Sequence, residues 1–186
     1  GQLRYFEDQR GQMPGQPATD YGGSAYAGEV DLHLSDRWRF VLDQQWNPNT
    51  QRTDLSTFTV QNRFGSEGIV NFSYRYQRGY FEQVDVSAAL PITPSWRLIA
   101  RDNYALNDPV ALPTDPLGKS GRTLERYFGI EHDTCCITWR AIARHWIRDV
   151  EGDTDNAIYF EIEFKGIGSV GQKTDTFLRR GILGYQ

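Results

Sequence analysis

The sequence contains little of what helical proteins need. Its 186 residues include one methionine and two cysteines. No apolar run approaches the ~20 residues of a membrane-spanning helix. Helical spacing of apolar residues is absent until the segment "TDTFLRRGIL" near the C-terminus, which predicts a helical turn or two. A mainly helical fold is therefore excluded, whether soluble or membrane-spanning.

An excess of basic charge is also missing. The 20 Lys and Arg residues against 24 Asp and Glu give a net charge of -4, which argues against a nucleic-acid-binding surface. The sequence does not open with the charged and apolar regions of a signal peptide. Because "GQLRYFEDQR" begins in mid-pattern, we expect a mature or excised piece of a longer protein.

Strict alternation of apolar and polar residues is the dominant pattern. Aromatic residues make up 13% of the chain, and many occupy every second position, as in "IVNFSYRYQ" and "RWRFVLDQQW". This period predicts β-strands with one apolar face. We expect roughly ten antiparallel strands, each close to the ~10 residues of a membrane β-strand. Besides 37–46, 69–77 and 157–165, they are Leu3–Gln9, Ser24–Leu34, Ser56–Phe64, Glu82–Leu90, Trp96–Leu106, Leu124–Asp133 and Ile137–Ile147.

The predicted connections alternate between long and short along the chain. Long segments such as "NDPVALPTDPLGKSGR" follow short ones such as "ITPS", an order typical of transmembrane β-barrels with short periplasmic turns and longer outer loops. Two short turns lead into "SDRWRF" and "TPSWRL". We expect Trp38 and Trp96 at one membrane interface, which amphipathic indole rings prefer.

The polar faces predict a wide barrel. So many charges cannot fill a small dry interior, since buried unpaired charge is too costly, so they indicate a hydrated or polar-filled lumen. Ten strands would enclose little more than packed side chains. The chain is thus predicted to form an arc of a larger barrel. The residues expected to face lipid are Phe40, Phe72, Leu98, Phe160 and Ile162, and those expected to face the lumen are Arg39, Arg75, Arg101 and Glu161.

Several possible catalytic or ligand motifs are better explained structurally. The triplet in "PLGKSG" lacks a phosphate loop's first glycine, because Pro113 stands in its place, and no strand-to-helix context follows. The three histidines, His33, His132 and His145, lie on separate strands without metal-ligand spacing. The carboxylates Glu161 and Glu163 fit a polar lumen stripe better than a catalytic pair. We predict no enzyme activity and no cofactor.

The two cysteines, Cys135 and Cys136, are adjacent in a short turn. Neighbouring cysteines rarely bond each other, because the small ring strains the peptide between them. The turn is predicted to lie on the periplasmic side, where the environment is oxidising. We therefore expect disulfides to cysteines outside these 186 residues, in another segment or another chain. Two free thiols in a cytosolic protein are the alternative.

The C-terminal third resembles the LptD family of lipopolysaccharide-assembly proteins. The resemblance rests on "TLERYFGIEHDTCCITWRAIARHW" with its vicinal cysteines, on "DNAIYFEIEFKGIGSVG" and on the closing "FLRRGILGYQ". It extends less specifically over the rest of the chain. It implies that residues 1–166 are the last strands of a 26-stranded outer-membrane barrel and that residues 167–186 form a C-terminal tail.

The same resemblance implies partners and a function in the outer membrane of a Gram-negative bacterium. The partners are lipopolysaccharide (LPS), an LptE-like lipoprotein plug in the lumen, and an N-terminal periplasmic domain whose cysteines bond Cys135 and Cys136. The function is insertion of LPS into the outer leaflet through a lateral gate. The gate strand would be the last strand, about Ala157–Gly166, with gate residues Ala157, Ile158, Tyr159, Phe160, Glu161, Ile162, Glu163 and Phe164.

Two other functions stay open at this point. A porin-like diffusion channel would also have a charged lumen, and it would conduct ions independently of LPS. A secreted β-sandwich binding module would be soluble without detergent and would lack a lipid-facing band.

Overall fold

The computed structural model describes residues 2–4, 7–11, 19–65, 67–107, 121–148 and 153–185, with side chains from Ser24 onward. Nearly all of these residues lie in antiparallel β-strands. Among the described residues, no helix is long and apolar enough to cross a membrane.

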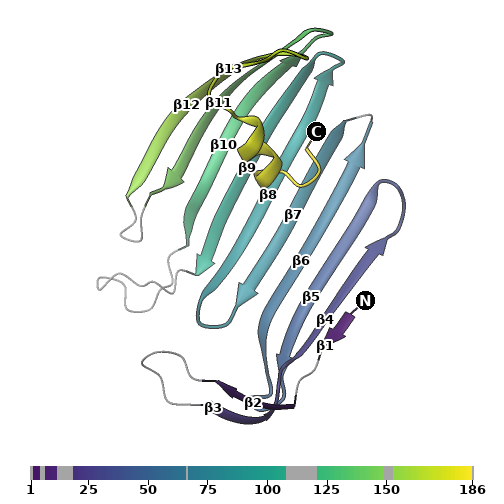
Figure 1. Ribbon diagram of the computed structural model, residues 1–186, viewed down its shortest axis with the longest axis vertical. Helices are drawn as coiled ribbons and strands as arrows, with labels where there is room; N and C mark the ends of the chain where they lie inside the picture. The colour runs from purple at the N-terminus through teal and green to yellow at the C-terminus, as the bar shows by residue number, and fades with distance from the viewer. Residues whose placement is uncertain are drawn as a thin grey trace.

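One large open sheet contains eleven of the strands and follows chain order almost throughout (Figure 1). Its strands in spatial order are β1 (Gln2–Arg4), β4 (Tyr26–His33), β5 (Trp38–Asn47), β6 (Arg52–Phe64), β7 (Gly68–Gln77), β8 (Phe81–Thr93), β9 (Trp96–Asn107), β10 (Arg122–Asp133), β11 (Ile137–Ile147), β12 (Thr154–Phe164) and β13 (Gly168–Gly171). Because every neighbour is antiparallel and the sheet curves without closing, the chain forms an arc of a β-barrel, as predicted.

The N-terminal part differs from the prediction. The single strand expected at Leu3–Gln9 is two strands, β1 and β2 (Glu7–Gly11). Strand β2 pairs with β3 (Thr19–Gly23) in a separate two-stranded sheet, so a segment expected to be a long connection is partly β-structure.

Short turns gather at one end of the sheet. Residues 34–37, 65–67, 94–95, 134–136 and 165–167 connect strands there, whereas 48–51, 78–80, 108–121 and 148–153 connect them at the other end. We call these the turn end and the loop end. The difference in length between the connections at the two ends is smaller than predicted. Strand β6 begins at Arg52 and so extends into the segment that was predicted to be a long connection. Residues 116–120, which include the lysine and serine of "PLGKSG", lie outside the described part of the chain.

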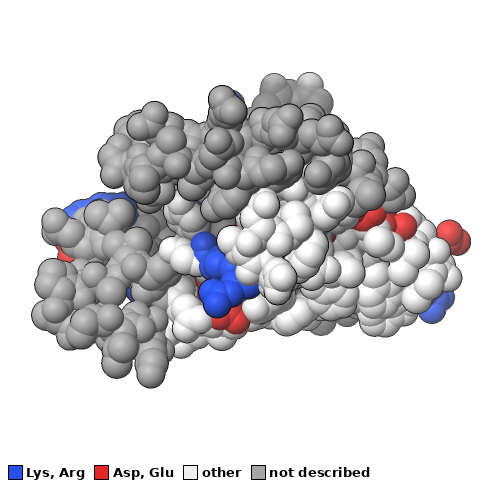
Figure 2. Space-filling model, turned by 90° about the horizontal axis from the view of Figure 1, so that it is seen from below, with Lys and Arg blue, Asp and Glu red and all other residues white. Residues whose placement is uncertain are grey.

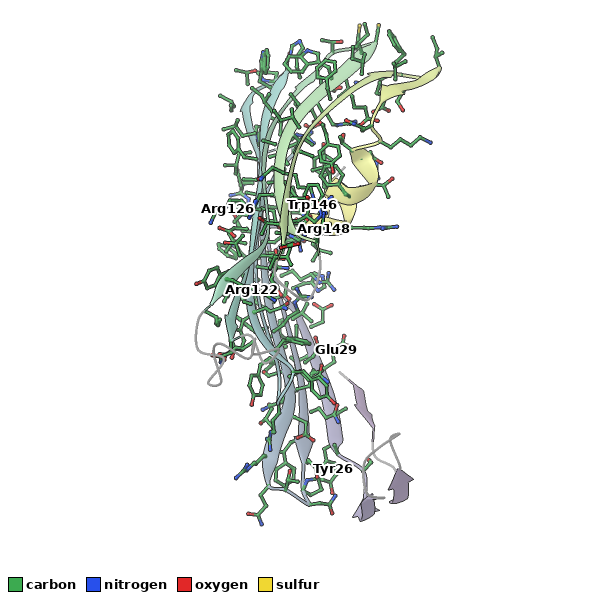
Figure 3. All side chains as sticks on the ribbon, turned by 90° about the vertical axis from the view of Figure 1, so that its left-hand side faces the viewer. Tyr26, Glu29, Arg122, Arg126, Trp146 and Arg148 are labelled. Atoms are coloured by element: carbon green, nitrogen blue, oxygen red, sulfur yellow. The ribbon has the colours of Figure 1, made fainter. Side chains whose placement is uncertain are left out.

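The two faces of the sheet carry the predicted sets of side chains. We call the face that contacts the C-terminal helix the inner face and the opposite one the outer face. Cross-strand register with period-two alternation places the predicted lipid-facing set on the outer face and the predicted lumen set on the inner face. Figure 3 shows Arg126 projecting from the side opposite the helix and Trp146 lying on the helix side.

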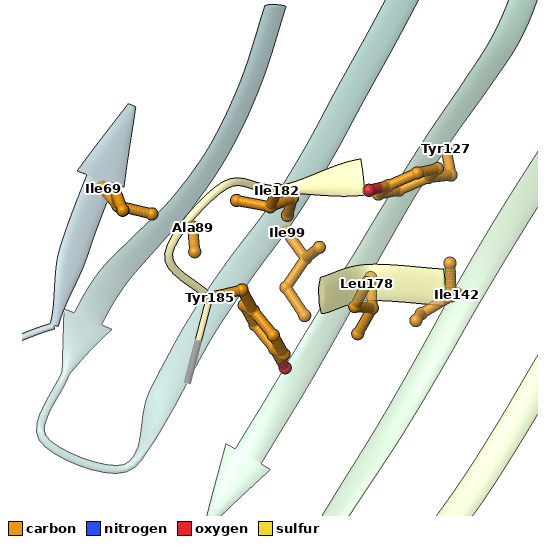
Figure 4. Close-up of a cluster of buried hydrophobic side chains, with 8 residues drawn as sticks. All are labelled: Ile69, Ala89, Ile99, Tyr127, Ile142, Leu178, Ile182 and Tyr185. Carbon is orange, nitrogen blue, oxygen red and sulfur yellow. The ribbon is translucent and has the colours of Figure 1, made fainter. Parts of the chain in front are cut away.

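The chain after β13 folds back over the inner face. The predicted helical turns form α1 (Asp175–Gly181), which lies across the middle of the sheet in Figure 1. Leu178, Ile182 and Tyr185 from this tail are at most 5% exposed. They pack on inner-face residues of β7 to β11 in one cluster, whose sheet members are Ile69, Ala89, Ile99, Tyr127 and Ile142 (Figure 4). Burying each large apolar side chain contributes roughly 1.5–3 kcal/mol, so the tail is an integral layer of the fold.

Candidate functional site

Most charges on the inner face are paired with each other. The guanidinium of Arg101 lies 2.5 Å from carboxylate oxygens of both Asp85 and Glu125, and Arg144 lies 2.6 Å from Glu125. These groups sit on consecutive strands β8 to β11, so each arginine bridges strands. The side chains of Arg101, Asp85 and Glu125 are less than a fifth exposed.

A second and more deeply buried network lies toward the turn end. Arg140 contacts Glu131 at 2.5 Å, Glu163 at 3.1 Å and Glu161 at 3.3 Å, while Arg97 adds a contact to Glu131 at 3.4 Å. Low-exposure charges of this kind need opposite charge and hydrogen bonds to balance their loss of solvation. The expected polar-filled lumen is therefore observed along this arc as ion pairs that the tail partly covers.

The tail is attached to the same network by polar contacts. The backbone N–H and the hydroxyl of Thr174 both donate to Glu161, at 3.0 and 2.5 Å, and the Tyr185 hydroxyl donates to Glu131. Burial raises the pKa of Tyr185, so its hydroxyl keeps the proton that it donates. Nearer β7, the carbonyl of Leu183 accepts from the amides of Gln61 and Asn71 at 2.9 and 3.1 Å. The tail thereby links β12, the last long strand, to β6 and β7 across the inner face.

A cavity of about 960 Å³ opens between the tail and the turn end of the sheet. Its lining has both signs of charge, including Arg37, Arg63, Asp133, Glu163 and Lys173. At the opposite end of the sheet, the view from the loop end shows positive and negative groups of the described residues next to each other (Figure 2). The arrangement suits a hydrated space that holds a polar, largely uncharged chain better than a selective ion site.

The predicted gate strand lies at the end of the arc, but the structure corrects its position as last strand. Strand β12 pairs with β11 along its whole length, and β13 follows it and pairs with Glu161–Phe164. The other edge of Thr154–Tyr159 has no strand partner among the described residues. The predicted gate residues divide by face, with Ala157, Tyr159, Glu161 and Glu163 inward and Ile158, Phe160, Ile162 and Phe164 outward. The open edge is therefore in the loop-end half of β12.

The cysteine turn joins β10 to β11 at the turn end. Cys135 and Cys136 are both exposed and unbonded, with their Sγ atoms 2.7 Å apart. The turn is fastened to the next one, because the N–H of Lys165 donates to the Cys136 carbonyl at 3.0 Å and its ammonium donates to the Thr134 carbonyl at 2.6 Å. Hydrogen bonding to Cys135 raises the pKa of the Cys136 thiol. Both thiols point to solvent and can reach partners outside the arc.

The histidines do not come together. His33 lies 3.5 Å from Asp31, and His145 contacts Asn156 at 2.8 Å. The His132 ring packs against Trp96 at a tilt, with ring centroids 4.4 Å apart, and Trp96 contacts Trp139 edge-on at 5.2 Å. The described residues contain no group of three or more His, Cys, Asp or Glu side chains able to hold a metal ion. The aromatic cluster at the turn end fits the interface position predicted for Trp96.

Sequence reasoning missed the part that the tail plays in this site. The residues concerned are Thr174, Leu178, Ile182 and Tyr185, which follow one another at spacings of three or four. That spacing was the available signal, because it predicts one buried face on a short helical segment.

Comparison of the sequence with known proteins gives matches to the LptD family. A sequence model for the family described as LPS transport system D matches residues 1–96, just over half of the chain. The LPS-assembly proteins LptD of Xylella fastidiosa strain 9a5c and Xanthomonas campestris pv. campestris strain 8004 are 37% identical over 192 residues and 33% identical over 199. The LptD of Nitrosococcus oceani strain ATCC 19707 is 32% identical over 185 residues. In each case all of this chain and 23% of the relative are covered, so the chain spans about a quarter of these proteins. The chain belongs to the LPS transport system D, or LptD, family.

Proposed function

We infer that this chain is the C-terminal wall of an LPS translocon in the outer membrane of a Gram-negative bacterium. The proposal rests on the free backbone edge in the loop-end half of β12. Thr154–Tyr159 offers an unpaired backbone edge beside an outward side chain, Ile158, that is 80% exposed. In hydrocarbon each orphan backbone group would cost several kcal/mol, so the first strand of the complete barrel closes this edge at rest.

The mechanism that fits is lateral opening. Strand β13 holds the turn-end half of β12, and the tail holds Glu161 from the inner face. The seam between β12 and the first strand of the complete barrel is then limited to the loop-end half of β12. Few hydrogen bonds between the two strands need to break there. The inner face and its cavity accommodate the sugar chain of LPS, while the acyl chains pass between β12 and the first strand into the outer leaflet. No bond is made or broken, so this chain requires neither an enzymatic group nor a cofactor.

The proposal includes two further components. The thiols of Cys135 and Cys136 point away from the arc at the turn end, where an N-terminal periplasmic domain of the same protein would form one disulfide with each. An LptE-like lipoprotein would plug the lumen of the complete, 26-stranded barrel. The inner surface of β4 and β5, which lies beyond the docked tail, is the part of this arc that is left for it.

The structure disfavours the two other functions considered. A diffusion channel needs an open aqueous path, whereas here the tail covers the centre of the inner face and the central arginines are paired with carboxylates. A β-sandwich needs a second large sheet, and in the described residues a helical tail and ion pairs occupy that position instead.

Site-specific photo-cross-linking in cells tests the proposal. A photoreactive phenylalanine analogue replaces Tyr159, on the open edge, in the full-length protein, and adducts are probed for LPS. We expect an LPS adduct there and none with the analogue at Val41, an inner-face position on β5 remote from the edge. Absence of LPS from Tyr159 adducts, in cells whose surface LPS is normal, would contradict passage along this strand.

A further inference from the structure

The outer face of β9 to β12 carries a row of polar side chains that barrel architecture does not require. Arg126 pairs with Asp102 in the cross-strand register, and on the next two strands His145 and Asn156 continue the same row. Arg126 donates to Asp102 from Nε at 3.0 Å and from Nη2 at 2.5 Å. The side chain of Arg126 is 60% exposed on this face and points away from α1 in Figure 3.

The height of this row places it within the expected apolar band. The aromatic cluster at the turn end includes His132, six residues from Arg126 along β10. Six residues rise about 20 Å, or roughly 15 Å across a membrane for a strand tilted by ~40°, whereas the apolar band of an outer-membrane barrel is about 25 Å tall. With the loop end outside, as the proposed function has it, the row lies in the outer-leaflet half of this band, and the surface on its turn-end side faces the acyl chains. Polar groups at that depth need a polar partner.

A hollow lies directly on the turn-end side of the Arg126–Asp102 pair. Its volume is about 260 Å³. Two register-paired alanines, Ala88 and Ala100, form its floor, and Phe128, 58% exposed, forms a wall beside them. Small residues beside a large aromatic one leave a hollow with apolar walls, which an acyl chain can occupy, and a guanidinium at one end.

We propose that this hollow and polar row form a binding site for the phosphorylated headgroup and one acyl chain of an outer-leaflet glycolipid. The acyl chain lies over the two alanines against Phe128. A phosphate accepts hydrogen bonds from Arg126, whose Nη1 has no partner among the described residues. Asp102 Oδ1 is buried without a partner there, so Arg126, whose side chain is 60% exposed, is the group of this pair that a ligand can reach.

The width of the row favours a sugar headgroup over a single phosphodiester. From Arg126 to Asn156 the row crosses two strand spacings, or roughly 10 Å. It presents a cation, an imidazole and an amide, a mixture of donors and acceptors that suits hydroxyl groups together with phosphate. The cationic end of the site, Arg126, lies on β10, and its amide end, Asn156, lies on β12, at whose open edge the proposed function releases a glycolipid.

The test uses the full-length protein in phosphatidylcholine nanodiscs with a trace of bis-phosphorylated lipid A. The photoreactive analogue replaces Phe128, and lipid adducts are identified by mass. Arg126→Ala should lower the lipid A adduct about tenfold, as expected for loss of one charge-assisted hydrogen bond. Arg39→Ala is the matched control, because Arg39 forms the same kind of pair with Asp31 on the inner face at 2.7 Å, and it should leave the adduct unchanged.

Two further arms keep the test decisive. Ala100→Leu fills the hollow without removing charge and should reduce the adduct as strongly, which decides the matter if Arg126→Ala does not fold. Dephosphorylated lipid A and phosphatidylglycerol should both give weak adducts. An adduct that is insensitive to Arg126→Ala and Ala100→Leu, or equal with phosphatidylglycerol, would overturn the site. Because the Tyr159 cross-link in cells tests export separately, failure here leaves the proposed function standing.

Discussion

At the scale of single residues, Arg140 has the most concentrated set of ion pairs in the described part of the inner face. It contacts three carboxylates and its side chain is 9% exposed. Arg140→Met would leave the buried Glu161 without a positively charged partner among the described residues, and Glu131 with Arg97 alone, at a cost of about 3–5 kcal/mol. Urea unfolding of the full-length protein, followed by its heat-modifiable mobility on gels, measures this. Arg39→Met removes a more exposed pair and should cost at most ~1 kcal/mol. Equal effects would show that the buried network is not structural.

The two faces make opposite predictions for a pair of neighbours on β7. Phe72 is on the outer face and 39% exposed, while Ser73 points inward and contacts Thr59 at 3.1 Å. Phe72→Arg near the membrane midplane should destabilise the barrel by about 2–4 kcal/mol, and Ser73→Arg should have little effect, because arginine fits a hydrated lumen. The same unfolding assay compares the two. Larger destabilisation by Ser73→Arg would reverse the assignment of lipid and lumen faces.

The cysteine pair predicts redundancy. Both thiols are exposed in one turn, so either alone can tether a periplasmic domain. We expect Cys135→Ser and Cys136→Ser to be tolerated singly, and the double substitution to cripple assembly, since both long-range cross-links that orient the domain are lost. Non-reducing gels and cell viability are the readouts. A stable Cys135–Cys136 disulfide in the native full-length protein would refute this scheme.

Residue-level reasoning from the sequence succeeded where the period of two was unbroken. The faces of Phe40, Arg101 and Phe160 followed directly from it, because one face of each strand had to be apolar. The partners of the inward charges could not be predicted. Whether Glu131 bonds Arg97, Arg140 or the Tyr185 hydroxyl depends on cross-strand register and on a tail that returns from 54 residues away.

At the scale of elements, the tail after β13 is the part that sequence patterns described least. The sequence "TDTFLRRGIL" predicts the helix, but it does not predict where the helix packs on the sheet. A helix of seven residues carries no sequence pattern that identifies its distant contacts. Strand β13 was missed for a similar reason. Its sequence "GSVG" has two glycines and no alternation of apolar and polar residues. It forms a strand because it pairs with the edge of β12, which the sequence pattern does not reveal.

Because the tail packs on the sheet, we predict that a substitution in its helix lowers the stability of the barrel. Leu178 is fully buried against the inner face, so Leu178→Ala should cost about 2–5 kcal/mol through lost burial and a cavity. The substitution Arg180→Ala, on the exposed side of the same helix, is the control. Protease sensitivity of the C-terminus and the unfolding midpoint are the measurements. An unchanged midpoint for Leu178→Ala would mean that the tail does not rest on the inner face in the complete barrel.

At the scale of the whole molecule, the arc ends at β12, whose loop-end half has no strand partner among the described residues. The turn-end half of β12 is fixed by β13 and by the tail, and Cys135 and Cys136 lie at the same end of the sheet. The chain belongs to the LptD family and spans about a quarter of the length of the LPS-assembly relatives that it matches. Under the proposed function, strands outside this chain would complete the barrel and supply the partner of Thr154–Tyr159.

Locking that seam tests the central claim most directly. In the full-length protein, one cysteine replaces Asn156 and a second replaces its register partner on the barrel's first strand. A control lock joins Ala143 to Ile158, register partners across the β11–β12 seam. Surface LPS is measured after inducible expression of each variant, with folding and the native disulfides checked on non-reducing gels. We predict that the terminal lock abolishes LPS export and that the control lock leaves it unchanged. Normal export with the terminal seam locked would contradict lateral release through β12 and favour a diffusion channel.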